Sequence, residues 1–197
     1  MNNLLLISTG GIVAIVIAVI VVALIIGLVC WYISCYNGLV SLRNRTEEAW
    51  ATIDVHLKKR YDLIPNLVAT VKGYAKHESE TLERVIAARN RAMSASGDDK
   101  LAAENVLSGT LKTLFALTES YPDLKANTNF IDLQRQLQRV EEELAAARRY
   151  FNGVVKELNN KIEMFPSSIV ARRMRLEKRK YFELDSAEER QNVKVEF

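Results

Sequence analysis

The chain has 197 residues, 49% of them hydrophobic, and a formal net charge of +3, and its length suits a single domain. Its two cysteines, Cys30 and Cys35, exclude a disulfide framework and a CxxC metal or redox motif. Only three prolines occur, and apolar residues recur with helical rather than alternating spacing, so the sequence predicts an all-α protein.

An apolar segment at residues 12–33 opens the chain, and no charged side chain precedes Arg43. As a helix, these 22 residues would rise about 33 Å, close to the ~30 Å hydrocarbon core of a bilayer. A signal peptide would need a positive N-terminal flank and a shorter apolar core. We therefore expect an uncleaved transmembrane anchor over residues 1–35, with Trp31 and Tyr32 at the headgroup level.

Basic residues follow the span and are absent from its N-terminal side; they are Arg43, Arg45, Lys58, Lys59 and Arg60. The positive-inside rule then predicts that the N-terminus lies outside and the larger domain lies in the cytoplasm.

The first soluble helix is expected to continue from the span to about residue 95, either folded at Pro65 or left continuous. Apolar or small residues three and four apart support it, at Leu39, Leu42, Thr46, Ala49, Ile53, Leu57, Ile64, Leu67, Val71, Tyr74, Leu82, Val85 and Ile86. Pro65 removes a backbone donor, so a kink near residues 62–64 is expected. Residues 96–99 read as a turn in which an aspartate caps the next helix.

Two further helices complete the predicted bundle. One covers about 100–120, and the other runs from the caps at 127–129 to Pro166 with a 3-4 apolar repeat at Phe130, Leu133, Leu137, Val140, Leu144, Ala147, Phe151, Val155 or Val154, Leu158, Ile162 and Phe165. These lengths predict an antiparallel bundle of three or four helices over residues 36–166, with coiled-coil-like packing, followed by a basic tail over residues 167–197.

Residues for catalysis are scarce in this sequence. His56 and His77 lie 21 positions apart, and Thr81 stands where an HExxH motif needs its second histidine. No glycine-rich phosphate loop occurs, and Glu141 suits a structural ion pair better than acid-base catalysis. The sequence therefore predicts a protein that is not an enzyme, without metal, cofactor or small-molecule substrate.

The tail carries two features that could bind partners. Arg172, Arg173 and Arg175 begin a basic run that could contact anionic headgroups, although a solvated basic tail is the simpler interpretation. Nucleic acid is disfavoured because few aromatic residues interleave with the run. Residues 193–197 resemble a strand ending at Phe197, which could add to a receptor edge or a neighbouring subunit.

Several motifs resemble the LemA family across residues 36–185. They are Tyr36-Asn37-Gly38-Leu39-Val40, Arg43-Asn44-Arg45, Glu48-Ala49-Trp50, Tyr61-Asp62-Leu63-Ile64-Pro65-Asn66-Leu67, Tyr121-Pro122-Asp123-Leu124-Lys125-Ala126-Asn127, Asn129-Phe130, Leu133-Gln134, Ala147-Arg148-Arg149-Tyr150-Phe151-Asn152 and Phe165-Pro166-Ser167. The resemblance implies a bacterial protein with an N-terminal span or lipoprotein signal before a helical bundle, without established catalytic residues. It also implies association with membrane proteases or other small membrane proteins.

Polar signature residues on the predicted helices are candidate interaction residues, because polar groups on an apolar seam can set register or partner choice. They are Tyr61, Asp62, Pro65, Asn66, Arg148, Asn152 and Asn159. Some LemA relatives carry a lipidated cysteine before a Tyr-Asn pair, and Cys35 stands in that register. Lipidation there, with the domain outside the cytoplasm, is the alternative to an intact span.

Two functions fit these features. The first is a scaffold that self-associates at the bacterial inner membrane through its helical faces. The second is an adaptor that presents the bundle or Phe197 to a membrane protease or another membrane partner.

Overall fold

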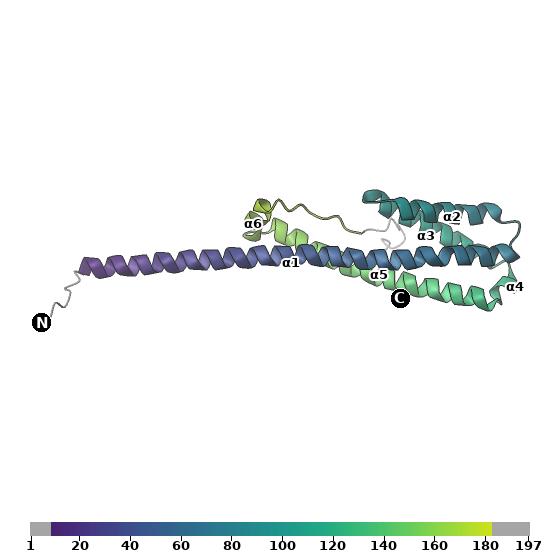
Figure 1. The fold of residues 1–197 in the computed structure, drawn as a ribbon, viewed down its shortest axis with the longest axis horizontal. Coiled ribbons are helices and arrows are strands. Elements are labelled where there is room, and N and C mark those ends of the chain that lie inside the picture. Colours follow the sequence, from purple (N-terminus) through teal and green to yellow (C-terminus); the bar gives the residue numbers. More distant parts are fainter. Residues whose placement is uncertain (1–8, 183–197) are drawn as a thin grey trace, which may run out of the picture. The chain divides into compact units, whose positions relative to one another are not determined.

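A computed structural model describes residues 9–182, and these residues form helices joined by turns and one extended segment. The first helix, α1 (Thr9–Tyr74), contains both the apolar segment and the start of the bundle, so no loop separates the two (Figure 1). Within the described residues, α1 is the one helix whose length and composition would allow it to cross a membrane. The side chains along its apolar segment are exposed. The predicted all-α fold, in which the apolar segment is continuous with the first helix of the bundle, is confirmed.

Contacts divide the chain into two units. The first contains residues up to Thr46 together with Lys156–Arg179, and the second contains Glu47–Val155 together with residues from Lys180 onward. We call the first the anchor unit and the second the bundle unit. Both α1 and α5 (Thr128–Glu163) contribute residues to each unit.

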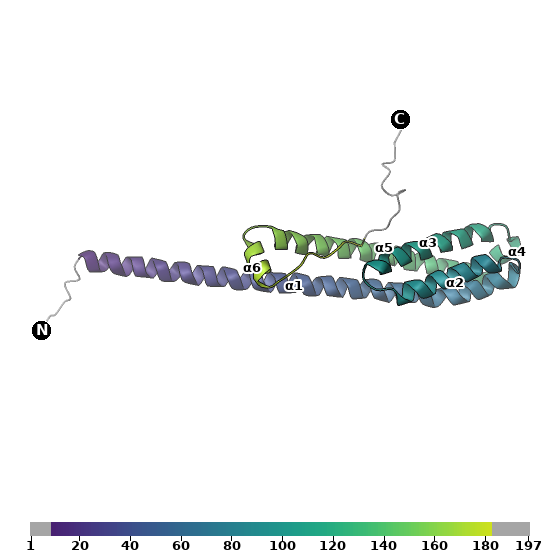
Figure 2. The same ribbon diagram turned by 90° about the horizontal axis from the view of Figure 1, so that it is seen from above.

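The bundle unit packs parts of α1 and α5 with α2 (Ser79–Ser94), α3 (Asp98–Thr118) and the short α4 (Pro122–Lys125) (Figure 2). Helical periodicity places the apolar side chains of each helix on one face, which the others cover. The largest buried members of this core include Ile53, Leu57, Ile64, Leu67, Leu107, Leu114, Leu124, Phe130 and Leu144. The predicted four-helix alternative is therefore the observed one.

The chain reverses after Tyr74, not at Pro65. Helix α1 continues without interruption through Pro65, and residues 75–78 form the turn into α2. The prediction of one helix to residue 95 was therefore wrong. Because α2 folds back, Leu82 and Val85 enter the same core as Leu67, which they could not do from a continuing helix.

The predicted turn near residue 97 is confirmed, but its cap is not an aspartate. Gly97 is the N-cap of α3, with φ of 59°, and no side chain there donates or accepts a capping hydrogen bond. A positive φ favours glycine because it has no Cβ. Asn127 does act as a cap, since its Oδ1 accepts a hydrogen bond from the Phe130 N–H at 3.0 Å.

In the anchor unit, α6 (Ser167–Arg173) and the C-terminal end of α5 pack on α1. Their core comprises Leu39, Leu42, Leu158, Val170 and Ala171, with Trp31, Cys35 and Ile162 packed against it. Phe165 was expected to continue the seam of α5, but the helix ends at Glu163 and the Phe165 side chain is 81% exposed. It lies in the turn between α5 and α6, where the helical periodicity no longer applies.

Candidate functional site

A network of charged side chains lies inside the bundle unit. Arg60 is 1% exposed, and its Nη1 atom lies 3.2 Å from Oε2 of the fully buried Glu104. Its Nε atom lies 2.8 Å from Glu141 Oε1, and its Nη2 donates to Ser108 Oγ at 2.8 Å. Glu141 thus takes part in an ion pair with a residue of another helix, and Arg60 joins α1 to α3 and α5.

Tyr61 extends this network. Its hydroxyl donates a hydrogen bond to Glu104 Oε1, and the Lys100 ammonium lies 5.2 Å from the centre of its ring. Burial, followed by the hydrogen bond and the negative charge of Glu104, raises the pKa of the Tyr61 phenol far above its ordinary value. Tyr61 is therefore a neutral hydrogen-bond donor at physiological pH.

Arg60 also forms part of the lining of a pocket of about 390 Å³ between α1, α3 and α5. Apolar walls come from Leu111, Phe115 and Leu137, and Glu141 lies at its polar side. Since the buried guanidinium is already paired with two carboxylates, this arrangement neutralises charge instead of presenting it to a ligand.

A second arrangement holds the segment that follows α6. Phe182 is 4% exposed and packs on Trp50 and Phe151 of the bundle unit, whose rings contact each other at 5.4 Å. The Trp50 and Phe182 ring centres are 5.8 Å apart, and the Arg148 guanidinium lies 4.6 Å from the Phe182 ring. Asn152 hydrogen-bonds both backbone groups of Phe182.

Asn159 performs the same role in the anchor unit. Its Oδ1 accepts from the Arg179 N–H at 2.9 Å, and its Nδ2 donates to the Arg179 C=O at 2.9 Å. A carboxamide has one acceptor and donors in one plane, so it can replace the backbone partner that an extended residue would find in a sheet. Both asparagines thus bind their own chain.

The other predicted interaction residues are not gathered into one site. Asp62, Pro65 and Asn66 lie on the exposed side of α1. The arginines of the basic run, Arg172, Arg173 and Arg175, are exposed in and after α6. Phe197 and the strand expected at residues 193–197 lie outside the described residues.

Sequence reasoning missed Arg60, Glu104, Trp50 and Phe182. Arg60 was considered only for membrane orientation, although the apolar spacing of α1 skips from Leu57 to Ile64. That gap was the available signal, because a helix face continues through positions 60 and 61.

The histidines do not assemble a metal site in the described part of the chain. His56 is half-buried and its Nδ1 lies 3.1 Å from Glu143 Oε2 on α5. Within residues 9–182, no three His, Cys, Asp or Glu side chains come together as metal ligands would.

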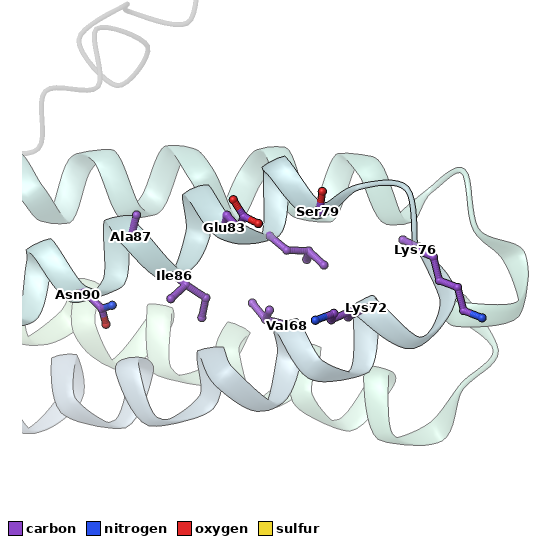
Figure 3. Close-up of a pocket in the computed structure, with 10 residues that line it drawn as sticks. Val68, Lys72, Lys76, Ser79, Glu83, Ile86, Ala87 and Asn90 are labelled. Atoms are coloured by element: carbon purple, nitrogen blue, oxygen red, sulfur yellow. The ribbon is translucent and has the colours of Figure 1, made fainter.

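A groove of about 410 Å³ lies between the end of α1 and α2. Figure 3 shows Val68 of α1 and Ile86 of α2 pointing into the space between the helices, with Lys72 and Glu83 also lining it. Its surface is mainly apolar with charges at the edges.

These features define a class of protein: an α-helical bundle whose first helix includes a candidate membrane span. A sequence model of the LemA family matches residues 49–197, and the chain belongs to this family. It is also similar to Protein LemA of Metamycoplasma hominis, with 26% identity over 150 residues, which cover 74% of this chain and 67% of that protein.

Proposed function

We propose that this chain is a non-enzymatic, membrane-anchored scaffold that self-associates at the bacterial inner membrane. The observation that carries the proposal is the continuity of α1, which joins an exposed apolar segment to a packed bundle helix without a linker. Anchoring restricts all copies to one plane, which raises their effective concentration for lateral association.

A cytoplasmic bundle is the proposed orientation. Arg43 and Arg45 follow the apolar segment within a few turns, and no Lys or Arg precedes it. Labelling of engineered surface cysteines with a membrane-impermeant maleimide in intact cells tests this: labels should react only after permeabilisation.

A structural role is supported by how the charged groups are used. The buried cation of Arg60 pairs with Glu104 and Glu141, and Tyr61 donates to Glu104, so the charges of these groups offset one another. Such a network stabilises a particular helix arrangement.

Self-association is tested by crosslinking in intact membranes, followed by mass determination of the complex in nanodiscs. The proposal predicts species larger than one chain by both methods. A single copy per nanodisc together with no crosslinked product would contradict it. Deleting residues 9–35 provides the control, because loss of the anchor should lower crosslinking even if the bundle folds.

A second candidate function is an adaptor for a membrane protease or another membrane partner. The α1–α2 groove favours it, because an apolar surface flanked by Lys72 and Glu83 suits a peptide or helix of a partner. Replacing Ile86 with Glu should then abolish co-purification of the partner, whereas Val106→Glu on exposed α3 should not. Deleting residues 193–197 tests the terminus separately.

Lipid attachment at Cys35 remains the alternative anchor. The Cys35 side chain packs against the Leu39 and Leu42 cluster of the anchor unit, which favours its role as an ordinary helix residue. The intact mass of the purified chain separates the two anchors: cleavage before Cys35 with added acyl groups supports the alternative.

A further inference from the structure

The turn between α5 and α6 exposes three large apolar side chains. Met164, Phe165 and Ile169 are 62%, 81% and 58% exposed. They lie in the anchor unit, between the end of α5 and the middle of α6, and Figure 2 shows α6 beside α1. Three exposed apolar side chains of this size within residues 164–169 indicate a contact with an apolar partner.

Two contacts within the anchor unit show how close this turn lies to the apolar segment of α1. Arg45 Nη1 lies 3.8 Å from Glu157 Oε2, and Ile162, further along α5, packs against the cluster of Leu39, Leu42, Leu158, Val170 and Ala171, as Trp31 and Cys35 do. The C-terminal end of α5 is therefore the part of that helix that lies nearest to the apolar segment.

The rise per residue of a helix converts these contacts into distances along α1 and α5. Arg45 lies about 18 Å along α1 from Ile33, where the apolar segment ends, and Glu163 lies about 9 Å along α5 from Glu157. The end of α5 is thus about 9 Å from the level of Ile33, with Met164 and Phe165 beyond it. The headgroup layer on each side of a bilayer is roughly 5 to 8 Å thick, so the turn reaches it.

Exposed arginines follow the apolar turn in the chain. Arg172, Arg173 and Arg175 are exposed, while Val170 and Ala171 of the same short helix pack on α1. Arginines beside a bilayer are attracted to anionic lipid headgroups, and apolar side chains next to them can enter the acyl boundary.

We propose that the α5–α6 turn is a second membrane contact, in which Met164, Phe165 and Ile169 enter the bilayer interface and the three arginines bind anionic phospholipid headgroups. This inference rests on the proposed anchoring by α1. The occupant is a lipid surface because α6 packs on the same helix that carries the proposed span, and because the charges near the turn are mostly positive, with Glu163 paired to Lys178. The anchor unit would then contact the bilayer at two points.

Spin labels on single cysteines of the full chain test the proposal in nanodiscs containing anionic lipid. The variants are Phe165→Cys and Ile169→Cys in a Cys30→Ser/Cys35→Ser background, with Lys156→Cys in the same background as the exposed control on α5. A Cys35→Ser chain that keeps native Cys30 is the reference for the span. Oxygen partitions into lipid, whereas a nickel chelate stays in water. Positions 165 and 169 should show several-fold higher oxygen-to-nickel accessibility than position 156.

Each outcome bears on a separate claim. If position 30 reports lipid while positions 165 and 169 match position 156, the turn is in water and this inference is wrong although the anchor stands. If position 30 also reports water, the anchoring itself is wrong and the inference fails with it. Two labelled positions guard against disruption by either substitution, and circular dichroism verifies the fold of each variant.

The arginines are tested by replacing Arg172, Arg173 and Arg175 with Gln together. Label depth at position 165 should decrease in anionic nanodiscs and become equal to its value in zwitterionic ones. The matched control replaces three exposed arginines of α5, Arg135, Arg139 and Arg149, which removes the same charge elsewhere. Equal effects of the two triple variants would overturn the headgroup assignment.

Discussion

The side-chain amide of Asn152 forms two hydrogen bonds with the backbone of Phe182, accepting from its N–H at 2.8 Å and donating to its C=O at 3.0 Å. The Phe182 ring fills the space between Trp50 and Arg148 at the same time. The extended segment at Phe182 thus has hydrogen-bond partners for its backbone, as in a sheet. Its side chain also has apolar partners, as in a core.

Replacing Asn152 with Ala should release the Phe182 backbone. Two hydrogen bonds are lost, so we expect a decrease of about 1–3 kcal/mol in the free energy of unfolding in detergent. Hydrogen exchange of the Phe182 amide should accelerate, since that N–H is bonded only through Asn152 Oδ1 in the described contacts. Asn160→Ala, at an exposed position of α5, is the control, and an equal effect there would contradict the clamp.

Replacing Phe182 with Ala should destabilise the bundle unit by about 3–5 kcal/mol, because a buried aromatic ring leaves a cavity. The emission of Trp50 should shift to longer wavelength in a Trp31→Phe background as water reaches the indole. Tyr181 is 39% exposed beside it, so Tyr181→Ala should have little effect on either measurement. A Trp50 spectrum unchanged in Phe182→Ala would show that the ring contact is not formed in solution.

Removing Arg60 should be costly because Glu104 would remain buried without its cation. We expect Arg60→Met to lower the free energy of unfolding by about 3–5 kcal/mol, and Arg60→Met with Glu104→Met to recover much of the loss. The exposed pair of Arg84 and Glu80 offers a control, since Arg84→Ala should cost less than about 0.5 kcal/mol. A double variant less stable than Arg60→Met would argue against charge burial as the cause.

Stability should fall at alkaline pH through Tyr61. Its pKa is raised in the folded state by burial and by Glu104, so above pH ~10 the unfolded chain loses this proton while the folded chain keeps it. Each further pH unit should remove about 1.4 kcal/mol, whereas below pH ~10 this contribution does not vary. Denaturation against pH measures the slope, and Tyr61→Phe should reduce it. An unchanged slope would assign the alkaline loss to other groups.

Two glycine substitutions should have opposite signs. Gly109 lies within α3 and a Cβ built there meets no atom within 4 Å, so Gly109→Ala should stabilise by about 0.5–1 kcal/mol. Gly97→Ala should destabilise by about 1–3 kcal/mol, because φ of 59° is unfavourable for alanine. Thermal unfolding of both variants measures the difference, and a stabilising Gly97→Ala would mean that the turn adopts another conformation.

Local patterns in the sequence predicted much of the fold. Apolar residues three and four apart identified the helices, the uncharged run identified the candidate span, and Asn127 was recognised as a cap. These features depend on interactions within a few residues, which helical geometry relates directly to sequence spacing. The reversal after Tyr74 was missed, because neither glycine nor proline lies in residues 75–78 and both flanking segments have helical periodicity.

By itself, the sequence determined that this protein is helical, has one segment suited to a membrane, and lacks the motifs of common catalytic sites. The tertiary structure alone decided which polar residues are buried and what they contact. Arg60 meets Glu104 across 44 positions, and Asn152 meets Phe182 across 30. Which residues meet depends on how the helices pack and where the chain turns back. The periodicity along a single helix does not predict such contacts between residues far apart in the sequence.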